Sequence, residues 1–323
     1  MFPVQTALSL PSLDGAPVRD RAIVATLLYY DLFAFPLRAD EVVRFAHGPA
    51  ADAPWTAREL PRGGLWWESR DGFWFLKGRE QWIARRVELQ TASARKLPRA
   101  RKYARLLQLI PGVRFIGVTG SLAMESAVPE DDIDLLIVAA PDRLWLTRAL
   151  VLSALLAWGV KRPDDARTAY PDLICANIFL SECDLQLPDE NLFIAHELCQ
   201  MLPLLGKATY RSFLHANAWI KNYLPQWQPT HAPFQDRPPW RRIQRAFELG
   251  FADPLGARLE RELARRQLER IHGKHARGHN PNVKISPTQL RFHPRDLSDY
   301  VVNTFNARWN ALACEQSSVV SDQ

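Results

Sequence analysis

Two acidic residues, Asp132 and Asp134, stand one residue apart at the head of the apolar run LLIV. Residues i and i+2 of a strand share one face, so both carboxylates are expected to point the same way. Like charges held side by side repel each other unless a cation lies between them. Carboxylate oxygens are the ligands that Mg²⁺ and Mn²⁺ prefer, so the pair predicts a divalent metal site.

A glycine and a serine follow the preceding apolar run, VRFIGVTG. Gly120 allows the backbone to approach a ligand closely. Ser121 stands where a helix is expected to begin, so its hydroxyl and the free N–H groups behind it favour an anion. A phosphate cradle beside a metal-binding acid pair predicts a pocket for a nucleoside triphosphate with its metal ion.

These residues also have ordinary structural explanations. Asp132 and Asp134 are alternatively solvated acids at a strand end or helix-capping acids, and Ser121 is alternatively a plain helix cap. The neighbouring Asp131 is expected to be such a solvated or capping acid. The whole pattern of residue types and spacing favours the metal and phosphate site.

The segment around the motif alternates between strand and helix patterns. The expected elements are a strand in VRFIGVTG, a short helix at 121–126, a strand in IDLLIVA, a helix at 142–158 and a strand in LICANIFLS. This order predicts a sheet covered by helices.

The chain before the motif is expected to form a small helical unit with a hairpin. Two helices separated by Pro36 and a third near WTAREL precede aromatic strands on both sides of Asp71 and Gly72, a strong hairpin signal. This order is typical of a winged helix. Residues 79–110 are expected to form a basic helix interrupted near Pro98. Its cluster of Arg and Lys either meets phosphates or forms a solvated face.

After Glu190 the sequence predicts only helices, separated by proline-rich segments. Asn191 is expected to cap the first of them. His196 and Glu197 on that helix are weaker candidates for facing the pocket, with a structural histidine as the alternative.

A Gly-Ser after a strand, then ten residues, then Asp-hydrophobic-Asp leading a second strand resembles the nucleotidyltransferase superfamily. This is the fold of DNA polymerase beta and kanamycin nucleotidyltransferase. The resemblance implies that Gly120 and Ser121 contact the triphosphate and that Asp132 and Asp134 bind the metal ions. Most of the chain also resembles an uncharacterised prokaryotic group that joins a winged-helix-like N-terminus to such a domain.

The chain departs from the superfamily at its third carboxylate, which the family carries on the strand after the intervening helix. The corresponding run LICANIFLS contains no acid. Its strongly polar side chain is Asn177, either a nucleotide or metal ligand or a buried amide bonded to backbone. Three acids flank the strand and are candidates to complete the metal site: Asp172, Glu182 and Asp184.

We therefore expect an α+β protein: a nucleotidyltransferase-type mixed sheet with an N-terminal winged-helix-like unit and a helical C-terminal region. The expected divisions are a lead-in at 1–18, the winged-helix-like domain at 19–90, the nucleotidyltransferase domain at 91–190 and the helical domain at 191–323. The expected activity is transfer of a nucleoside monophosphate from an NTP to a hydroxyl acceptor, a small molecule or a protein, with Mg²⁺ or Mn²⁺. The alternative is a nucleotide-binding regulatory module whose winged helix contacts DNA or a protein.

Composition sets the broad class. The 323 residues carry 41 basic and 35 acidic side chains, a net charge of +6 that is compatible with nucleic acid and does not indicate it. The four cysteines show no metal-ligand spacing, so reduced thiols are expected. The longest apolar run is too short to span a bilayer and contains Arg148, so no membrane association and a cytoplasmic location are expected.

Overall fold

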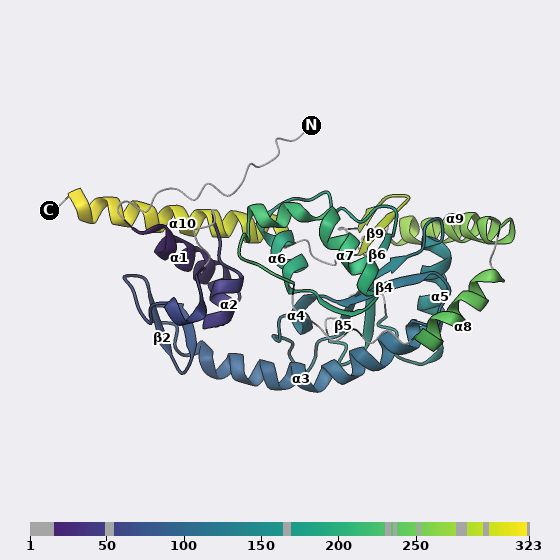
Figure 1. The fold of residues 1–323 in the computed structure, drawn as a ribbon, viewed down its shortest axis with the longest axis horizontal. Coiled ribbons are helices and arrows are strands. Elements are labelled where there is room, and N and C mark those ends of the chain that lie inside the picture. Colours follow the sequence, from purple (N-terminus) through teal and green to yellow (C-terminus); the bar gives the residue numbers. More distant parts are fainter. Residues whose placement is uncertain are drawn as a thin grey trace.

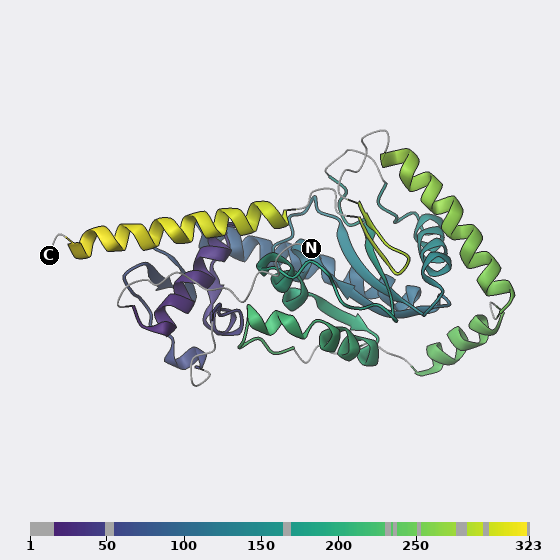
Figure 2. The same cartoon turned by 90° about the horizontal axis from the view of Figure 1, so that it is seen from above.

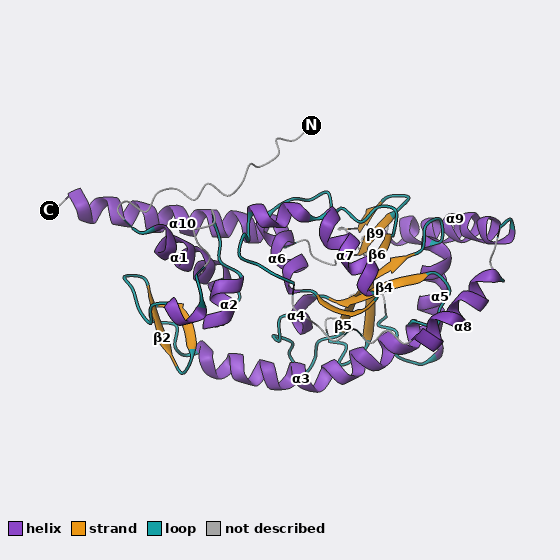
Figure 3. Ribbon diagram, in the orientation of Figure 1, coloured by secondary structure: helices purple, strands orange, loops and turns teal. Residues whose placement is uncertain are grey.

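The computed structural model describes residues 16–48, 55–163, 169–229, 234, 238–250, 253–275, 283–292 and 297–321. Residues 1–15 of the expected lead-in lie outside this range. The described chain contains a three-stranded and a six-stranded sheet. Figure 3 shows the helices that surround these strands. The expected α+β class is therefore confirmed.

The N-terminal unit packs helices against the smaller sheet, whose strands run antiparallel in the order β1-β3-β2. Its elements are α1 (Val18–Asp31), β1 (Leu37–Arg38), α2 (Ala39–Arg44), the 3-10 turn η1 (Ala57–Glu59), β2 (Trp67–Arg70) and β3 (Phe73–Leu76). The expected hairpin is present, with Asp71 and Gly72 in its turn. Helix α1 is buried over most of its length because β3 and α10 (Ser298–Ser321) both contact it.

The long helix α3 (Trp82–Leu107) runs from the N-terminal unit to the larger sheet (Figure 1). The expected interruption is wrong, because the helix continues through Pro98. Proline removes one backbone hydrogen bond, whereas the turns on both sides keep theirs. Ala100, Tyr103 and Leu107 pack into the core beside the larger sheet and hold the second half in place.

The larger sheet has the strand order β7-β4-β5-β6-β9-β8. Its strands are β4 (Val113–Val118), β5 (Ile133–Ala139), β6 (Ile174–Ser181), β7 (Leu202–Leu205), β8 (Val283–Ile285) and β9 (Gln289–Phe292). Strands β5 and β6 are parallel and the other neighbouring pairs are antiparallel. Helix α5 (Leu144–Ala157) makes the crossover that a parallel pair requires.

The expectation that strands stop after Glu190 is wrong, because β7, β8 and β9 all follow it. The sequence LPLL continues the apolar pattern of α6 (Leu192–Gln200) and resembles a helix end, yet it pairs with β4 at the edge of the sheet. Pro203 is tolerated there because an edge strand does not need every ladder hydrogen bond. Asn191 caps α6 as expected, its Oδ1 accepting a hydrogen bond from the Ile194 N–H at 3.0 Å.

The remaining helices complete both faces of the larger sheet. They are α4 (Gly120–Ala123), α7 (Lys207–Ala216), the 3-10 helix η2 (Ala218–Asn222), α8 (Pro238–Leu249) and α9 (Leu255–His275). Helix α10 returns to the N-terminal unit and lies along α1 (Figures 1 and 2). One hydrophobic core therefore joins α1, α6 and α10 with Phe115 and Leu136 of the larger sheet. Within the described residues, no helix combines the length and apolarity needed to cross a membrane.

Lys96 belongs to the basic cluster for which phosphate contact or a solvated helix face is expected. Its role in the structure is a different one, because it is a buried cation. Its side chain is only 4% exposed. The ammonium donates hydrogen bonds to the carbonyl oxygens of Pro129 at 2.8 Å and Asp131 at 2.9 Å, and to Asp172 Oδ1 at 2.9 Å. It therefore fixes the loop that leads into β5.

We predict that Lys96→Met lowers the free energy of unfolding by about 2 to 4 kcal/mol, because two carbonyls and a carboxylate lose a charged donor. Lys102→Met on the exposed face of the same helix is the control and should change it by less than about 0.5 kcal/mol. Urea denaturation measures both. Equal effects of the two substitutions would contradict this role of Lys96.

Candidate metal and nucleotide site

The end of β4 brings the Gly-Ser turn beside the acid pair. Strands β4 and β5 are antiparallel, with Val118 opposite Leu135. The Thr119 N–H then donates to the Asp134 carbonyl oxygen at 3.1 Å. Because of this register, the first residue after β4 lies beside the acid at the start of β5.

Gly120 is required by both its backbone angle and its surroundings. Its φ of +65° lies in the left-handed region that favours glycine. A Cβ placed there would lie 2.8 Å from Asp134 Oδ2, closer than a carbon is normally tolerated. The close backbone approach in the structure is therefore to the Asp134 carboxylate, and the expected approach of Gly120 to a bound phosphate stays a prediction.

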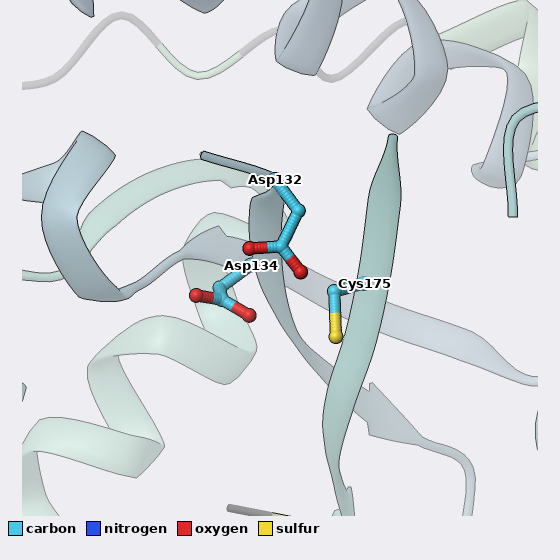
Figure 4. Close-up of side chains that lie close together, drawn as sticks. All are labelled: Asp132, Asp134 and Cys175. Atoms are coloured by element: carbon cyan, nitrogen blue, oxygen red, sulfur yellow. The ribbon is translucent and has the colours of Figure 1, made fainter. Parts of the chain in front are cut away.

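Asp132, Asp134 and Cys175 form one group, which we call the acid–thiol cluster (Figure 4). Each contributes one ligand atom, and the three atoms lie within 4.8 Å of one another. All three side chains are half-buried. The two carboxylates at this spacing suit a divalent cation. Cys175 ligates a metal only as the thiolate, and burial, followed by the charge of Asp134, raises the pKa of its thiol.

Cys175 is a residue of the site that the sequence pattern does not predict. The parallel register of β5 and β6 places it opposite Asp134. Its position two residues before Asn177 is a weak sequence signal, because the register of β6 shifts between Ala176 and Ile178. A search for a third acid on this strand passes over the thiol.

Asn177 lies beside the pair and holds one of its members. Its Nδ2 donates a hydrogen bond to Asp134 Oδ1 at 2.8 Å, and the residue is 8% exposed. Its own amide oxygen is buried and accepts no hydrogen bond from the described residues. Asn177 therefore orients Asp134, and its assignment as a nucleotide ligand stays a prediction.

Ser121 is tied to Asp131 rather than to the acid pair. Its hydroxyl donates to Asp131 Oδ2 at 2.8 Å, and the same oxygen accepts from the Val128 N–H at 3.1 Å. Asp131 therefore braces the loop between α4 and β5. The lone pairs of the Ser121 oxygen are not engaged by this donation, and its expected phosphate contact stays a prediction.

Burial and mutual repulsion govern the charge of the pair. Burial, followed by the negative charge of Asp132, raises the pKa of Asp134 from 3.8 to about 8. Burial also raises the pKa of Asp132, against the opposing effect of the Arg162 guanidinium. Without a bound cation, the pair therefore does not hold two full negative charges at neutral pH.

The three flanking acids expected as alternatives bond to other partners. Asp172 pairs with Lys96 at 2.9 Å, Glu182 accepts from the Thr209 hydroxyl at 2.7 Å, and Asp184 accepts from Thr288 at 2.5 Å. The acid–thiol cluster found among the described residues contains none of them.

Helix α6 supplies a different acid. Burial raises the pKa of Glu197 to about 7, and the charge of Glu197 contributes to the raised pKa of Asp134. Among the described residues, no side chain donates a hydrogen bond to its carboxylate or forms an ion pair with it. The preceding His196 is instead fully buried, with its Nε2 2.7 Å from His47 Nε2 and its ring stacked on Tyr29.

Comparison with protein-family models, with curated proteins and with solved structures finds no match.

We predict that the metal-free protein loses stability as the pH rises from about 4 to about 8. In this window the unfolded chain releases the Asp134 proton with its pKa near 3.8, whereas the folded chain retains it up to a pKa of about 8. Asp134→Asn cannot lose a proton, so the variant should match the wild type near pH 4 and exceed it at pH 8. Chemical denaturation in EDTA across this range measures the effect, and parallel pH profiles for the two proteins would contradict it.

Proposed function

We propose that this chain is a metal-dependent nucleotidyltransferase that moves a nucleoside monophosphate from an NTP to a hydroxyl-bearing acceptor. The observation that carries the proposal is the close approach of the Gly120 turn to Asp134, with Asp132 beside it. Backbone of the kind that binds phosphates thus lies next to carboxylates of the kind that bind the metal ion of a nucleoside triphosphate. The resemblance of the Gly-Ser and Asp-Ile-Asp spacing to the superfamily supports the same reaction.

Each residue has a defined part in this reaction. Asp132 and Asp134 would hold Mg²⁺ or Mn²⁺, which prefer oxygen ligands, while Gly120 and Ser121 would contact the triphosphate. The bound cation would neutralise phosphate charge and stabilise the pyrophosphate leaving group. Asn177 keeps the Asp134 carboxylate in one orientation through its hydrogen bond, which is the preorganisation that such catalysis requires.

Glu197 is suited to accept the proton of the attacking hydroxyl. In the reaction the acceptor oxygen bonds to the α-phosphorus, the bond from that phosphorus to the β-phosphate oxygen breaks, and the hydroxyl proton is lost. A base is most effective when its pKa lies near the working pH, and the pKa of Glu197 is about 7. Its negative charge contributes to the raised pKa of Asp134.

The N-terminal unit supports the winged-helix part of the proposal. Its order of α1, α2, η1 and the β2–β3 hairpin, with β1 added to the sheet, resembles that expected of a winged helix. We propose that this unit and the helices after β6 shape the site of the acceptor, a small molecule or a protein.

We predict that Asp132→Asn and Asp134→Asn each lower the rate of NMP transfer at least about 100-fold, because the cation loses a charged ligand. Incubation of the purified protein with labelled NTPs and Mg²⁺ or Mn²⁺ measures pyrophosphate release. Asp142→Asn, beyond the opposite end of β5, is the matched control and should retain activity. Absence of nucleotide binding by the wild type, or full activity in both site variants, would refute the proposed function.

We predict that Glu197→Gln lowers kcat by about 100-fold or more with little change in nucleotide affinity, because it removes a base and not a phosphate ligand. Single-turnover rates together with equilibrium binding of a non-hydrolysable NTP separate the two effects. Glu190→Gln, just before the same helix, is the control. A loss confined to nucleotide binding would rule out the base role.

A second function is favoured by one observation: the strand β6 supplies no carboxylate to the pair, and its place is taken by Cys175. The chain would then be a nucleotide-binding regulatory module whose winged helix contacts DNA or a protein. Nucleotide binding without pyrophosphate release supports this function. Salt-sensitive duplex binding that weakens on changing the exposed Arg70 and Lys77 supports its DNA form, and indifference to both changes excludes that form.

A further inference from the structure

Arg162 already places a positive charge on the acid–thiol cluster. Its Nε lies 2.8 Å from Asp132 Oδ2, and its Nη1 donates toward the Cys175 Sγ at 3.7 Å. One guanidinium thus contacts two of the three groups of the cluster. The sequence gives no sign of this contact, because Arg162 lies thirty residues after Asp132.

The contact is arranged so that it can be exchanged. The backbone of Arg162 is fixed by the hydrogen bond from its N–H to the Ile174 carbonyl oxygen at 3.0 Å. The side chains of Arg162 and Asp132 are 20% and 21% exposed, so solvent reaches the ion pair. Release of Asp132 therefore requires rotation of a side chain and no movement of the sheet.

A divalent cation and the guanidinium compete for the Asp132 carboxylate. A metal ion bound by Asp132 and Asp134 would lie within a few ångströms of the Arg162 charge, where two cations repel strongly in a half-buried site. The guanidinium would then remain close to the metal ion, because the backbone of Arg162 stays in place. Its planar set of donors matches phosphate oxygens, which it can bind in bidentate fashion.

We propose that Arg162 is an exchangeable cation: it neutralises Asp132 in the metal-free protein, is displaced by the divalent ion, and then binds the phosphates of the nucleotide. The phosphate step rests on the proposed nucleotidyltransferase function, whereas the exchange step depends only on the metal site. Arg162 is accordingly a specificity-determining residue. It opposes binding of the metal ion alone and favours binding of the metal ion together with an anionic ligand such as the nucleotide.

The exchange step is tested by Mn²⁺ binding without nucleotide, followed by electron paramagnetic resonance of the free ion. Arg162→Gln removes the competing charge, so its Mn²⁺ affinity should rise about fivefold over the wild type. The matched control is Arg308→Gln, which removes an arginine paired with Asp31 in the N-terminal unit. Unchanged or weaker Mn²⁺ binding by folded Arg162→Gln overturns the proposal.

The phosphate step is tested by calorimetric binding of a non-hydrolysable ATP analogue at saturating Mn²⁺. Arg162→Gln should bind the analogue about tenfold more weakly, because one charged phosphate contact is lost. Opposite changes in the two affinities cannot result from simple damage to the fold, which would weaken both. Unchanged analogue affinity overturns the phosphate step.

Arg162→Lys and the wild type distinguish failure of the exchange step from failure of the phosphate step. Arg162→Lys retains the charge without the planar donors, so its Mn²⁺ affinity should stay near the wild type while analogue affinity falls. A stronger Mn²⁺ affinity in this variant would also count against the exchange. If the wild type binds Mn²⁺ but no analogue, the proposed function fails and the metal experiment still decides the exchange step.

Discussion

The repulsion between two carboxylates at the head of β5 is the constraint on which the rest of the site depends. The side-chain period of a strand places Asp132 and Asp134 together, and burial removes much of the water that would screen them. The surrounding chain reduces this repulsion: Asn177 donates a hydrogen bond to Asp134, and Arg162 forms an ion pair with Asp132. The electrostatic cost of this arrangement is smallest when a divalent ion lies between the acids, which makes charge neutralisation the central property of the site.

The fold divides into features set by local patterns and features set by distant partners. The α+β class, the Asp-Gly hairpin and the strands β4, β5 and β6 follow from apolar runs and turn residues that act within a few positions. The short strands β7, β8 and β9 are three or four residues long and form because neighbouring strands offer hydrogen bonds. Pro98 is likewise kept inside α3 by packing that no local pattern reveals.

The candidate site divides in the same way. Gly120, Asp132 and Asp134 belong to one short stretch, so the sequence predicts their proximity, and a Cβ added at Gly120 would lie 2.8 Å from Asp134 Oδ2. Cys175 and Arg162 reach the pair through the parallel register of β5 and β6 and the loop before it. Their contribution depends on which strands become neighbours, and that is decided by the whole fold.

Helix α6 presents consecutive residues to two different surroundings. His196 is locked among the aromatic rings of the N-terminal unit, and Glu197 influences the charge of Asp134. Glu197 directly follows His196, so a displacement of α6 that breaks the His196 contacts would also move the carboxylate that influences Asp134.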